Sequence, residues 1–290
     1  MNEIGKYNEG IIMLSKKKIL FTGMSSYIGK NLMPLLSQLK DYEIVCYSRK
    51  QISGIKTIIG DISEREKIKK AMNGVDIIVH MASETTDKEK LFTTNVVGTQ
   101  NIVDMAKEQG ISKFIYLSSI SVTHYLGTPY PDSKKAAEEI IQQNLKKYII
   151  IRPTEIYGGI DSKKYMVHIN KIKNSRIFIT SRGDHYIQPV YVGDVAKAII
   201  KSIKSDRMHG IFISAGDKPE LKSEIYRMIR NKYNPKCILI FLPDWIAFLI
   251  RPIIGRKESW KDYKAGMIDR RYERDFKAIG FKEGLEYVKC

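Results

Sequence analysis

Short apolar runs alternate with amphipathic segments through the first half of this chain, and this alternation constrains the fold more than any other feature. Strands buried on both faces of a parallel sheet read as continuous apolar runs. Helices that cover such a sheet carry apolar residues at three- and four-residue spacing. Six runs of the first kind precede residue 155, at 18–22, 43–48, 57–59, 75–79, 114–117 and 148–151. The pattern predicts an α/β chain with a doubly wound parallel sheet.

A glycine-bearing turn follows the first predicted strand and leads into a segment, 32–39, with leucines at helical spacing. A strand, such a turn and a helix are typical of Rossmann-type dinucleotide sites, where the backbone approaches a pyrophosphate. Ser26 stands where the G-x-x-G-x-x-G pattern has its middle glycine, and its hydroxyl and that of Ser25 offer hydrogen bonds to phosphate. We therefore expect cofactor contacts from this turn: Gly23, Ser25, Ser26, Tyr27, Ile28 and Gly29.

The end of the second predicted strand carries cations where an acid would favour NAD. In NAD sites an acidic residue about 20 positions after the glycine turn binds the ribose hydroxyls. Here Ser48, Arg49 and Lys50 occupy that place. A hydroxyl and two cations fit a 2′-phosphate, so NADP is predicted ahead of NAD, with a solvated strand end as the alternative. Asp61, after the third predicted strand, is placed to accept a hydrogen bond from the adenine amino group.

Tyr130 and Lys134 are the main candidates for chemistry. Being four residues apart, they project from one face if this segment is the start of a helix that runs on through Ile141. An ammonium beside a phenol favours the phenolate, so we expect the pKa of Tyr130 to fall from about 10. Such a group suits the interconversion of an alcohol and a carbonyl. The spacing is common in a chain with 17 tyrosines, so its meaning depends on the cofactor motif beside it.

Several motifs, taken in their order, resemble the extended short-chain dehydrogenase/reductase family of the NAD-dependent epimerase/dehydratase type. The resemblance runs from residue 16 to near residue 200, and the rest of the chain matches little. The joint order and spacing of the motifs carry it, since each motif alone is modest. The matching motifs are Thr22-Gly23…Gly29, Gly60-Asp61-Ile62, His80-Met81-Ala82, Asn95…Gly98-Thr99, Leu117-Ser118-Ser119, Tyr130-x-x-x-Lys134, Arg152-Pro153 and Tyr191-Val192-Gly193-Asp194.

The resemblance implies roles for residues at the matching positions. Tyr130 is implied as the acid/base, and Lys134 as the group that lowers its pKa and holds the nicotinamide ribose. Ser119 is implied to orient the substrate oxygen. The family usually continues Val-Tyr-Gly after this serine, whereas the chain reads Val122-Thr123-His124, which is a departure on the substrate side. Further cofactor contacts are implied for Ile62, Met81, Ala82, Ser83, Asn95, Pro153 and Ile156.

The two positions after Ser119 bear on the type of reaction. The family's 4,6-dehydratases carry an Asp-Glu pair there to eliminate water, and this chain has Ile120 and Ser121. A 4-ketoreductase or a 4-epimerase needs no such pair. We predict an NAD(P)-dependent sugar-nucleotide epimerase or reductase, with a 4-ketoreductase favoured by Ser48 and Arg49. The alternatives are an NAD-dependent 4-epimerase of a nucleoside-diphosphate sugar and a non-catalytic NAD(P)-binding regulatory protein.

A nucleoside-diphosphate sugar is the predicted substrate. Glu84 and Thr85, after the fourth predicted strand, are candidate substrate contacts, with a solvated loop as the alternative, and Arg182 is a candidate partner of the diphosphate. A net charge of +17 suits an anionic substrate. The lysines are spread along the chain without an aromatic-basic motif, so no nucleic-acid partner is predicted. The resemblance also implies a homodimer through helices near 95–110 and 133–146.

The domain organisation follows from where the motifs stop. We expect an N-terminal extension at 1–15, a Rossmann NAD(P)-binding domain at 16–160 and a small substrate lobe at 161–290, with 186–214 returning to the core. The most apolar stretch, 238–254, is too short and too interrupted by prolines and charges for a transmembrane segment. A core helix or a wall of the substrate lobe is predicted there, with a surface membrane anchor as the alternative. Three separated cysteines lack metal-site spacing and indicate a reducing, cytoplasmic location.

Overall fold

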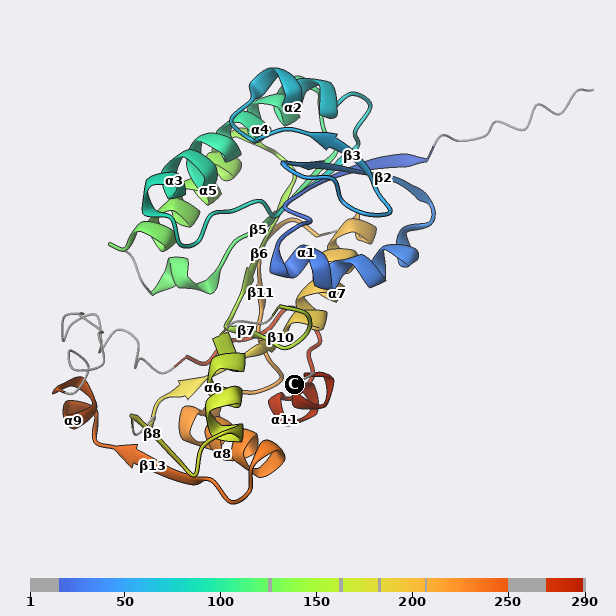
Figure 1. The fold of residues 1–290 in the computed structure, drawn as a ribbon. Helices are drawn as coiled ribbons and strands as arrows, with labels where there is room; N and C mark the ends of the chain where they lie inside the picture. Colours follow the sequence, from blue (N-terminus) through green and yellow to red (C-terminus); the bar gives the residue numbers. More distant parts are fainter. Residues whose placement is uncertain are drawn as a thin grey trace, which may run out of the picture.

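Seven strands form the main sheet of the protein, which crosses the larger part of the molecule in Figure 1. The structure is a computed structural model that describes residues 16–124, 127–161, 164–181, 184–206, 208–249 and 270–288. The predicted extension 1–15 lies outside the described residues. The strands of the sheet are β1 (Lys17–Thr22), β2 (Tyr42–Ser48), β3 (Lys56–Ile59), β4 (Ile77–His80), β5 (Lys113–Leu117), β6 (Tyr148–Pro153) and β11 (Gly210–Ser214).

The order of these strands is β11-β6-β5-β4-β1-β2-β3, and every neighbouring pair is parallel. This confirms the predicted α/β fold with a parallel sheet of Rossmann type. All six predicted strands are present, and β11, within the segment 186–214, pairs with β6 as a seventh. The carboxyl ends of parallel strands meet at one edge, so the residues that follow β1, β4, β5 and β6 are brought together there.

Helices cover both faces of the sheet (Figure 1). The helices α1 (Tyr27–Leu32) and α7 (Val192–Lys204) pack on one face, and α2 (Arg65–Ala71), α4 (Gly98–Glu108) and α5 (Pro129–Asn144) on the other. Side chains alternate along β1, so Ile19 and Phe21 join the core beneath α1 and α7 while Leu20 joins the core beneath α4 and α5. Burial on both faces explains why these strands read as continuous apolar runs.

The first helix is shorter than the leucine spacing predicted. The α-helix ends at Leu32, and the chain continues as a 3₁₀ helix, η1 (Met33–Leu39), with Pro34 in its first turn. Proline has no backbone N–H to donate and its ring clashes with the preceding helical turn, so it does not continue an α-helix. Of the leucines expected on one buried face, Leu32 and Leu39 are buried.

The smaller part of the molecule has its own core beyond the carboxyl edge of the sheet. Tyr157 lies at its centre with no exposed surface, and rings of Tyr165 and Phe281 pack against it. Three two-stranded pairings, β7 with β10, β9 with β12 and β8 with β13, complete this part. Its elements are β7 (Ile156–Tyr157), α6 (Lys164–Lys173), β8 (Ile177–Ser181), β9 (Tyr186–Ile187), β10 (Val190–Tyr191), β12 (Glu220–Leu221), α8 (Lys222–Tyr233), β13 (Ile238–Leu242) and α9 (Asp244–Leu249).

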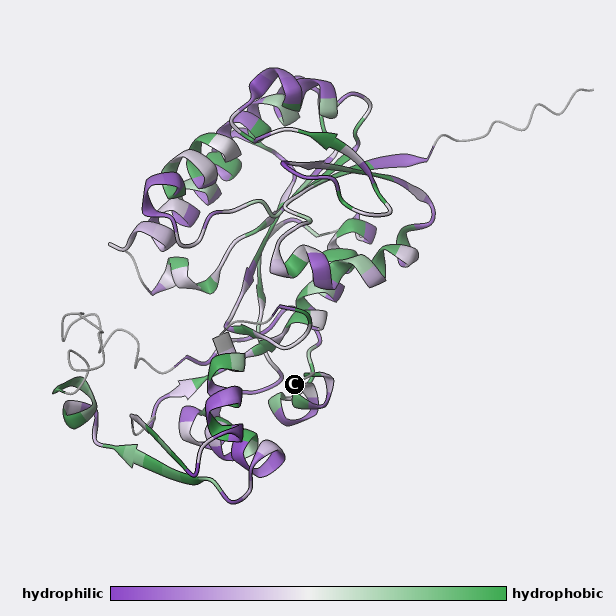
Figure 2. Ribbon diagram, viewed as in Figure 1, coloured by the Kyte–Doolittle hydropathy of each residue, from purple (hydrophilic) through white to green (hydrophobic). Residues whose placement is uncertain are grey.

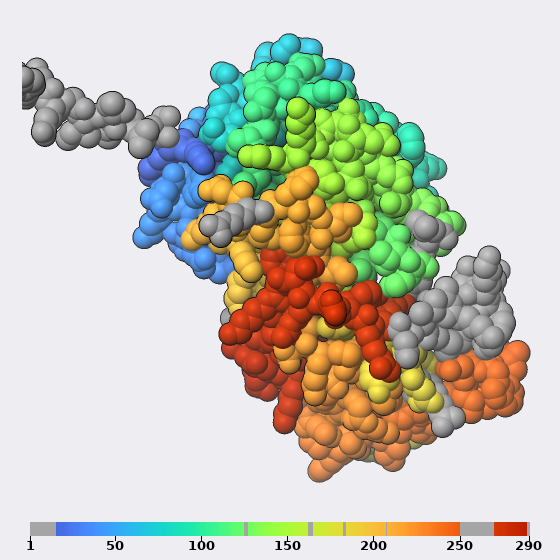
Figure 3. All heavy atoms as spheres, turned by 180° about the vertical axis from the view of Figure 1, so that it is seen from behind, coloured from blue at the N-terminus to red at the C-terminus, as the bar shows by residue number. Residues whose placement is uncertain are grey.

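The C-terminal residues 270–288 return to the larger part, as the red segment of Figure 3 shows. Asp275 exchanges two hydrogen bonds with Ile213 on β11, through its backbone N–H and its carboxylate. The backbone N–H of Ile279 donates to the Asp194 carboxylate of α7 at 2.9 Å. The segment ends in α11 (Phe281–Gly284) and a 3₁₀ turn, η4 (Leu285–Tyr287), which pack on the smaller core. It therefore contacts both parts of the molecule.

Of the two structures predicted for the apolar stretch 238–254, a core helix or a wall of the substrate lobe, the core helix is not found. Residues 238–242 form the strand β13 and residues 244–249 form α9, while 250–254 lie outside the described residues. Alternate residues of β13 are exposed, because the strand covers the smaller core with one face only. Among the described residues, no helix has the length and apolar character needed to cross a membrane.

We predict that Gly284→Ala destabilises the protein, because an added Cβ would lie 1.9 Å from the Tyr157 hydroxyl oxygen. The Tyr157 ring is fully buried among other rings and has no room to move, so we expect a loss of about 1–3 kcal/mol, the usual cost of overpacking. Gly280→Ala, four residues earlier in open space, is the matched control. Thermal unfolding of both variants provides the measurement. Equal melting temperatures for the two variants would contradict this packing.

Candidate active site

A cavity of about 800 Å³ lies at the carboxyl edge of the main sheet, where the two parts of the molecule meet. Its wall comes from the glycine turn, from the segments that follow β4, β5 and β6, and from α5 and residue 270. The predicted site residues on this wall are Ser25, Ser26, Tyr27, Ile28, Met81, Ser83, Thr85, Ser119, Tyr130, Lys134, Pro153 and Ile156. The remaining predicted residues lie off the wall or outside the described residues.

The glycine turn approaches the end of β4 very closely. A Cβ on Gly23, whose φ is +77°, would lie 2.5 Å from the backbone nitrogen of Ala82. A Cβ on Gly29 would lie 2.3 Å from the Met24 carbonyl oxygen. Ser26 is the N-cap of α1, and its hydroxyl oxygen accepts from the Gly29 N–H at 3.2 Å. The two glycines therefore keep the turn tight, and the serine in place of the middle glycine caps the helix.

Tyr130 and Lys134 both lie on α5, in its first two turns, as their spacing predicted. Lys134 is 2% exposed, and its Nζ donates to the Leu117 carbonyl at 2.9 Å and the Tyr116 hydroxyl at 3.2 Å. Burial lowers the pKa of Lys134 to about 7, and the nearby Glu138 carboxylate opposes this shift. The ammonium is thus directed at the end of β5 and is only weakly held in its charged form.

The expected fall in the pKa of Tyr130 is not found. Burial raises it to about 12, and a hydrogen bond with the Ser119 side chain lowers it only in part. Desolvation disfavours the phenolate, and the desolvated Lys134 is itself too readily deprotonated to supply a strong opposing field. Ser119 is the N-cap of the 3₁₀ turn η3 (Ile120–Thr123), which fixes it beside the phenol. Tyr130 is therefore in its protonated form at neutral pH.

A buried ion pair lies one helical turn beyond Lys134, and the sequence reasoning missed it. Glu138 has no exposed surface, accepts from the Arg152 Nε at 2.9 Å and from the Ser118 hydroxyl, and thereby joins α5 to β5 and β6. The signal was available, because an acid four residues after Lys134 shares its helix face. A buried carboxylate needs such partners to remain charged.

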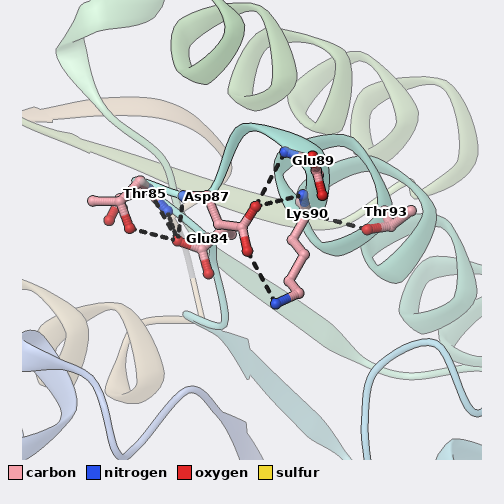
Figure 4. A network of polar contacts seen from close by, with 7 residues as sticks. Glu84, Thr85, Asp87, Glu89, Lys90 and Thr93 are labelled. Atoms are coloured by element: carbon pink, nitrogen blue, oxygen red, sulfur yellow. Dashed lines mark hydrogen bonds and ion pairs between the residues drawn. The ribbon is translucent and has the colours of Figure 1, made fainter.

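Glu84 and Asn95 shape the loop after β4 instead of facing the cavity. Figure 4 shows the Glu84 carboxylate directed at the backbone of its own turn, where it accepts from the N–H groups of Thr85 at 2.8 Å and Thr86 at 2.9 Å. These bonds lower the pKa of Glu84 to about 2. In the same view Asp87 caps α3 (Lys88–Phe92). The turn accounts for Glu84, and Thr85 alone of the predicted pair lines the cavity.

Asn95 lies on the π-helical turn η2 (Thr93–Val97) and is 1% exposed. Its amide donates to the Glu84 carbonyl and the Ser133 hydroxyl, both at 2.9 Å, and accepts from the Glu84 N–H at 2.8 Å. Asn95 therefore ties the loop after β4 to α5, close to Tyr130.

The remaining predicted cofactor residues lie at the ends of β2, β3 and β4. Tyr47 of β2 pairs with Thr22 of β1, the residue before Gly23. Ser48, which is buried, and Arg49, which is exposed, follow Tyr47 directly and therefore lie beside the glycine turn. Asp61 accepts from the Ser63 hydroxyl at 2.8 Å, an interaction within its own turn. Ile62 packs against Gly98, and Ala82 meets Gly23. None of these residues lines the cavity.

The cavity is lined by a different arginine from the predicted one. Arg182 lies outside the described residues, but Arg270 lines the cavity and is 6% exposed. Its guanidinium donates to the Glu155 carboxylate at 2.9 Å, and the Tyr165 hydroxyl donates to the same carboxylate at 3.0 Å. Glu155 also lines the cavity. Sequence spacing gave no signal for a pair 115 residues apart.

The described residues contain no group of three or more His, Cys, Asp or Glu side chains that could hold a metal ion. His80 is fully buried between Thr22 and Thr99, which contact its two ring nitrogens at 2.7 and 3.0 Å. Burial lowers the pKa of His80 to about 3, so the ring is neutral and links β1, β4 and α4. Its role is structural.

This architecture resembles that of several known proteins. The N-acetyl-α-D-glucosaminyl-diphospho-ditrans,octacis-undecaprenol 4-epimerase of Escherichia coli O157:H7 is 24% identical across 80% of this chain and 77% of that protein. The dTDP-4-dehydrorhamnose reductase of Bacillus anthracis, solved with NADP, superimposes with a TM-score of 0.71 at 19% identity, covering 93% of this chain and 98% of that one. The Bordetella bronchiseptica enzyme WbmG, solved with NAD and UDP, gives 0.64 at 16%, covering 86% and 93%.

At these identities the two structural likenesses show the fold alone. The sequence shows the family as well, because the model of one family matches residues 19–212, from the first strand of the sheet to the last. The matched range contains the glycine turn, Ser119, Tyr130 and Lys134. The chain belongs to the NAD dependent epimerase/dehydratase family.

Proposed function

We propose that this protein catalyses hydride transfer at a sugar carbon that alternates between hydroxyl and keto forms, in a sugar carried on a diphosphate. The observation that supports this most directly is that Ser119, Tyr130 and Lys134 line one cavity together with Ser25 and Ser26 of the glycine turn. A proton donor and a cofactor turn that line the same cavity are what such a reaction requires.

Tyr130, Ser119 and Lys134 have separate tasks in this proposal. A nicotinamide cofactor bound along the glycine turn would supply or accept the hydride. Tyr130 exchanges a proton with the substrate oxygen, and Ser119 donates a hydrogen bond to the same oxygen as its charge changes. Lys134 donates to the Leu117 carbonyl and the Tyr116 hydroxyl, and we assign its remaining N–H to the ribose. Because its pKa is about 7, Lys134 can also take up or release a proton near neutral pH.

Within this chemistry we favour a 4-ketoreductase that uses NADP. Reduction of a ketone requires a proton donor, and the raised pKa of Tyr130 keeps the phenol protonated. Arg49, exposed beside the glycine turn, suits a 2′-phosphate. Elimination of water is disfavoured, because Ile120 and Ser121 line the cavity where a dehydratase needs carboxylates. Among the described residues, two carboxylates line the cavity, and both are engaged: Glu155 by Arg270 and Tyr165, and Asp161 by Lys30.

A 4-epimerase is the second candidate, and the likeness to the E. coli 4-epimerase favours it. That reaction needs the same three side chains and a ketone intermediate that rotates to present its other face before the hydride returns. We propose a nucleoside diphosphate as the sugar carrier, as the UDP bound to WbmG suggests, whereas the E. coli relative is named for a diphospho-undecaprenol carrier. A regulatory protein that binds NAD(P) without turnover remains the alternative outside enzymes.

The proposal extends to the oligomeric state, the domains and the cellular location of the protein. We propose a homodimer through α4 and α5, next to which Phe92 and Val97 are 63% and 41% exposed. We also propose that residues 161–290 mostly form the substrate lobe, with residues 16–160 as the cofactor domain, and that the protein works in the cytoplasm, where its buried thiols Cys46 and Cys237 stay reduced.

Two assays separate the candidate reactions. A 4-ketoreductase consumes NADPH in proportion to an added 4-keto sugar nucleotide, followed by absorbance. A 4-epimerase interconverts two nucleotide sugars without net change in the cofactor, followed by chromatography. Binding of NADPH without turnover in either assay, across nucleotide sugars and diphospho-polyprenol sugars, would indicate the regulatory alternative.

Tyr130→Phe is expected to lower kcat by about 10²–10⁴-fold, because the variant keeps the ring but has no proton to give. NADPH affinity, measured by fluorescence, is expected to stay within a few-fold of the original. Tyr148→Phe is the matched control, since Tyr148 begins β6 at the far end of the strand from the cavity and its ring packs against His209. Turnover by Tyr130→Phe at the rate of this control would refute the assigned role.

Arg49→Asp tests the cofactor preference. Replacing the cation beside the glycine turn removes a charge-assisted bond to the 2′-phosphate and adds repulsion, so we expect the Kd for NADPH to rise about 10–100-fold. The Kd for NADH should change little. Lys56→Asp, on β3 at the edge of the same sheet, makes the same change in net charge and serves as control. An equal effect on both cofactors would contradict the NADP preference.

A further inference from the structure

Six large apolar side chains are exposed together on the strand pair β8–β13 and the helix α9. Ile177 and Ile179 of β8 lie opposite Ile238 and Ile240 of β13 in the parallel register. These four isoleucines are 50%, 55%, 59% and 37% exposed. We call them, with Trp245 and Leu249 of α9, the apolar patch. Figure 2 shows β13 and α9 in the colour of hydrophobic residues, at the end of the smaller part.

The patch exists because the strand pair has a core on one side only. Phe178 of β8 is buried, and Leu239 and Phe241 of β13 pack with it against α6 and α8. In a strand the residues between them point to the opposite face, and here that face carries isoleucine at four positions, followed by Ser181 and Leu242 at its carboxyl end. An exposed face of this kind commonly carries polar residues. A contiguous set of exposed aliphatic side chains is a mark of an interaction surface.

The helix α9 extends the patch at the carboxyl end of the strands. It begins two residues after β13 ends, and it contacts β8. Trp245 and Leu249 are four residues apart and so share a helix face, where they are 60% and 62% exposed. Ala247, between them, is the buried residue of the helix. A tryptophan at the margin of an aliphatic surface is typical of side chains that enter the interface of a lipid bilayer.

Basic side chains surround the opposite end of the patch. Arg176 precedes Ile177 directly, and its carbonyl accepts from the Ile238 N–H at 2.8 Å, so the starts of both strands lie together. Lys236 lies just before β13, and Lys171 and Lys173 end α6; all four of these cations are exposed. The sequence from 164 to 181 holds four basic residues and no acidic one. The whole chain carries a net charge of +17.

We propose that the apolar patch docks the protein on the surface of an anionic phospholipid bilayer. The isoleucines, Trp245 and Leu249 enter the interface, and the four cations contact the phosphate headgroups. Aliphatic insertion and basic attraction together are the two signals that hold a peripheral protein on such a surface. The charge complementarity favours an anionic membrane over an uncharged apolar partner. No membrane-spanning helix is needed, consistent with the described part of the chain.

The test is co-sedimentation of the full chain with lipid vesicles, without substrate or cofactor, so it does not depend on the proposed reaction. One vesicle set contains phosphatidylcholine with phosphatidylglycerol, and the other contains phosphatidylcholine alone. We expect binding to the first set, weaker binding to the second, and partial loss at high salt. The double variant Ile177→Thr/Ile240→Thr keeps β-branched residues in the strands, and we expect its affinity for the anionic vesicles to fall at least about tenfold.

The double variant Ile59→Thr/Ile211→Thr is the matched control, because these isoleucines are 49% and 38% exposed on the main sheet. Binding by the control as tight as by the unaltered protein supports the proposal. Three results would overturn it: no binding of the unaltered protein to anionic vesicles, equal loss in both double variants, or binding that the patch variant retains in full. A fourth result would come from light scattering. If the unaltered protein were an oligomer and the patch variant alone a monomer, the patch would join copies of this chain.

Discussion

The buried ammonium of Lys134 is the interaction on which the arrangement of the site depends. A cation with 2% exposure must have partners, and it finds them in the Leu117 carbonyl and the Tyr116 hydroxyl at the end of β5. One turn later, Glu138 binds Arg152 on β6 and Ser118 after β5. These bonds fix the rotation of α5 over the two strands. Tyr130, on the same helix, is thereby held beside Ser119.

The same burial sets the protonation states. It lowers the pKa of Lys134 to about 7 and raises that of Tyr130 to about 12, so the phenol starts as an acid. Glu138 limits the first shift, because a carboxylate near the ammonium favours its charged form. The neutral His80, by contrast, adds no charge behind the site. The electrostatics of the cavity thus come from how deeply each group is placed as well as from which groups are present.

Local patterns predicted what local forces determine. Apolar runs located six of the seven strands, and the spacing of Tyr130 and Lys134 placed both on α5. The glycine turn was recognisable because Gly23 must lie against Ala82, which leaves no room for a side chain. Features that depend on distant contacts were missed. The pKa of Tyr130 follows from three-dimensional burial, and Arg270 meets Glu155 across 115 residues. Glu84 is a local exception, since its carboxylate accepts from the N–H groups of its own turn. Pro34 was visible in the sequence, yet its effect, a 3₁₀ turn, needed the structure.

Arg270 lies close to the C-terminus, so the two walls of the cavity can form at different times during synthesis of the chain. The glycine turn, Ser119, Tyr130 and Lys134 all belong to a sheet whose first six strands are complete by residue 153. The wall with Glu155 is finished only when residues 270–288 return to β11 and α7. On the ribosome the wall with Ser119, Tyr130 and Lys134 can therefore form while the wall with Glu155 is still open. The part of the cavity at Arg270 is therefore the last to close as the chain is synthesised.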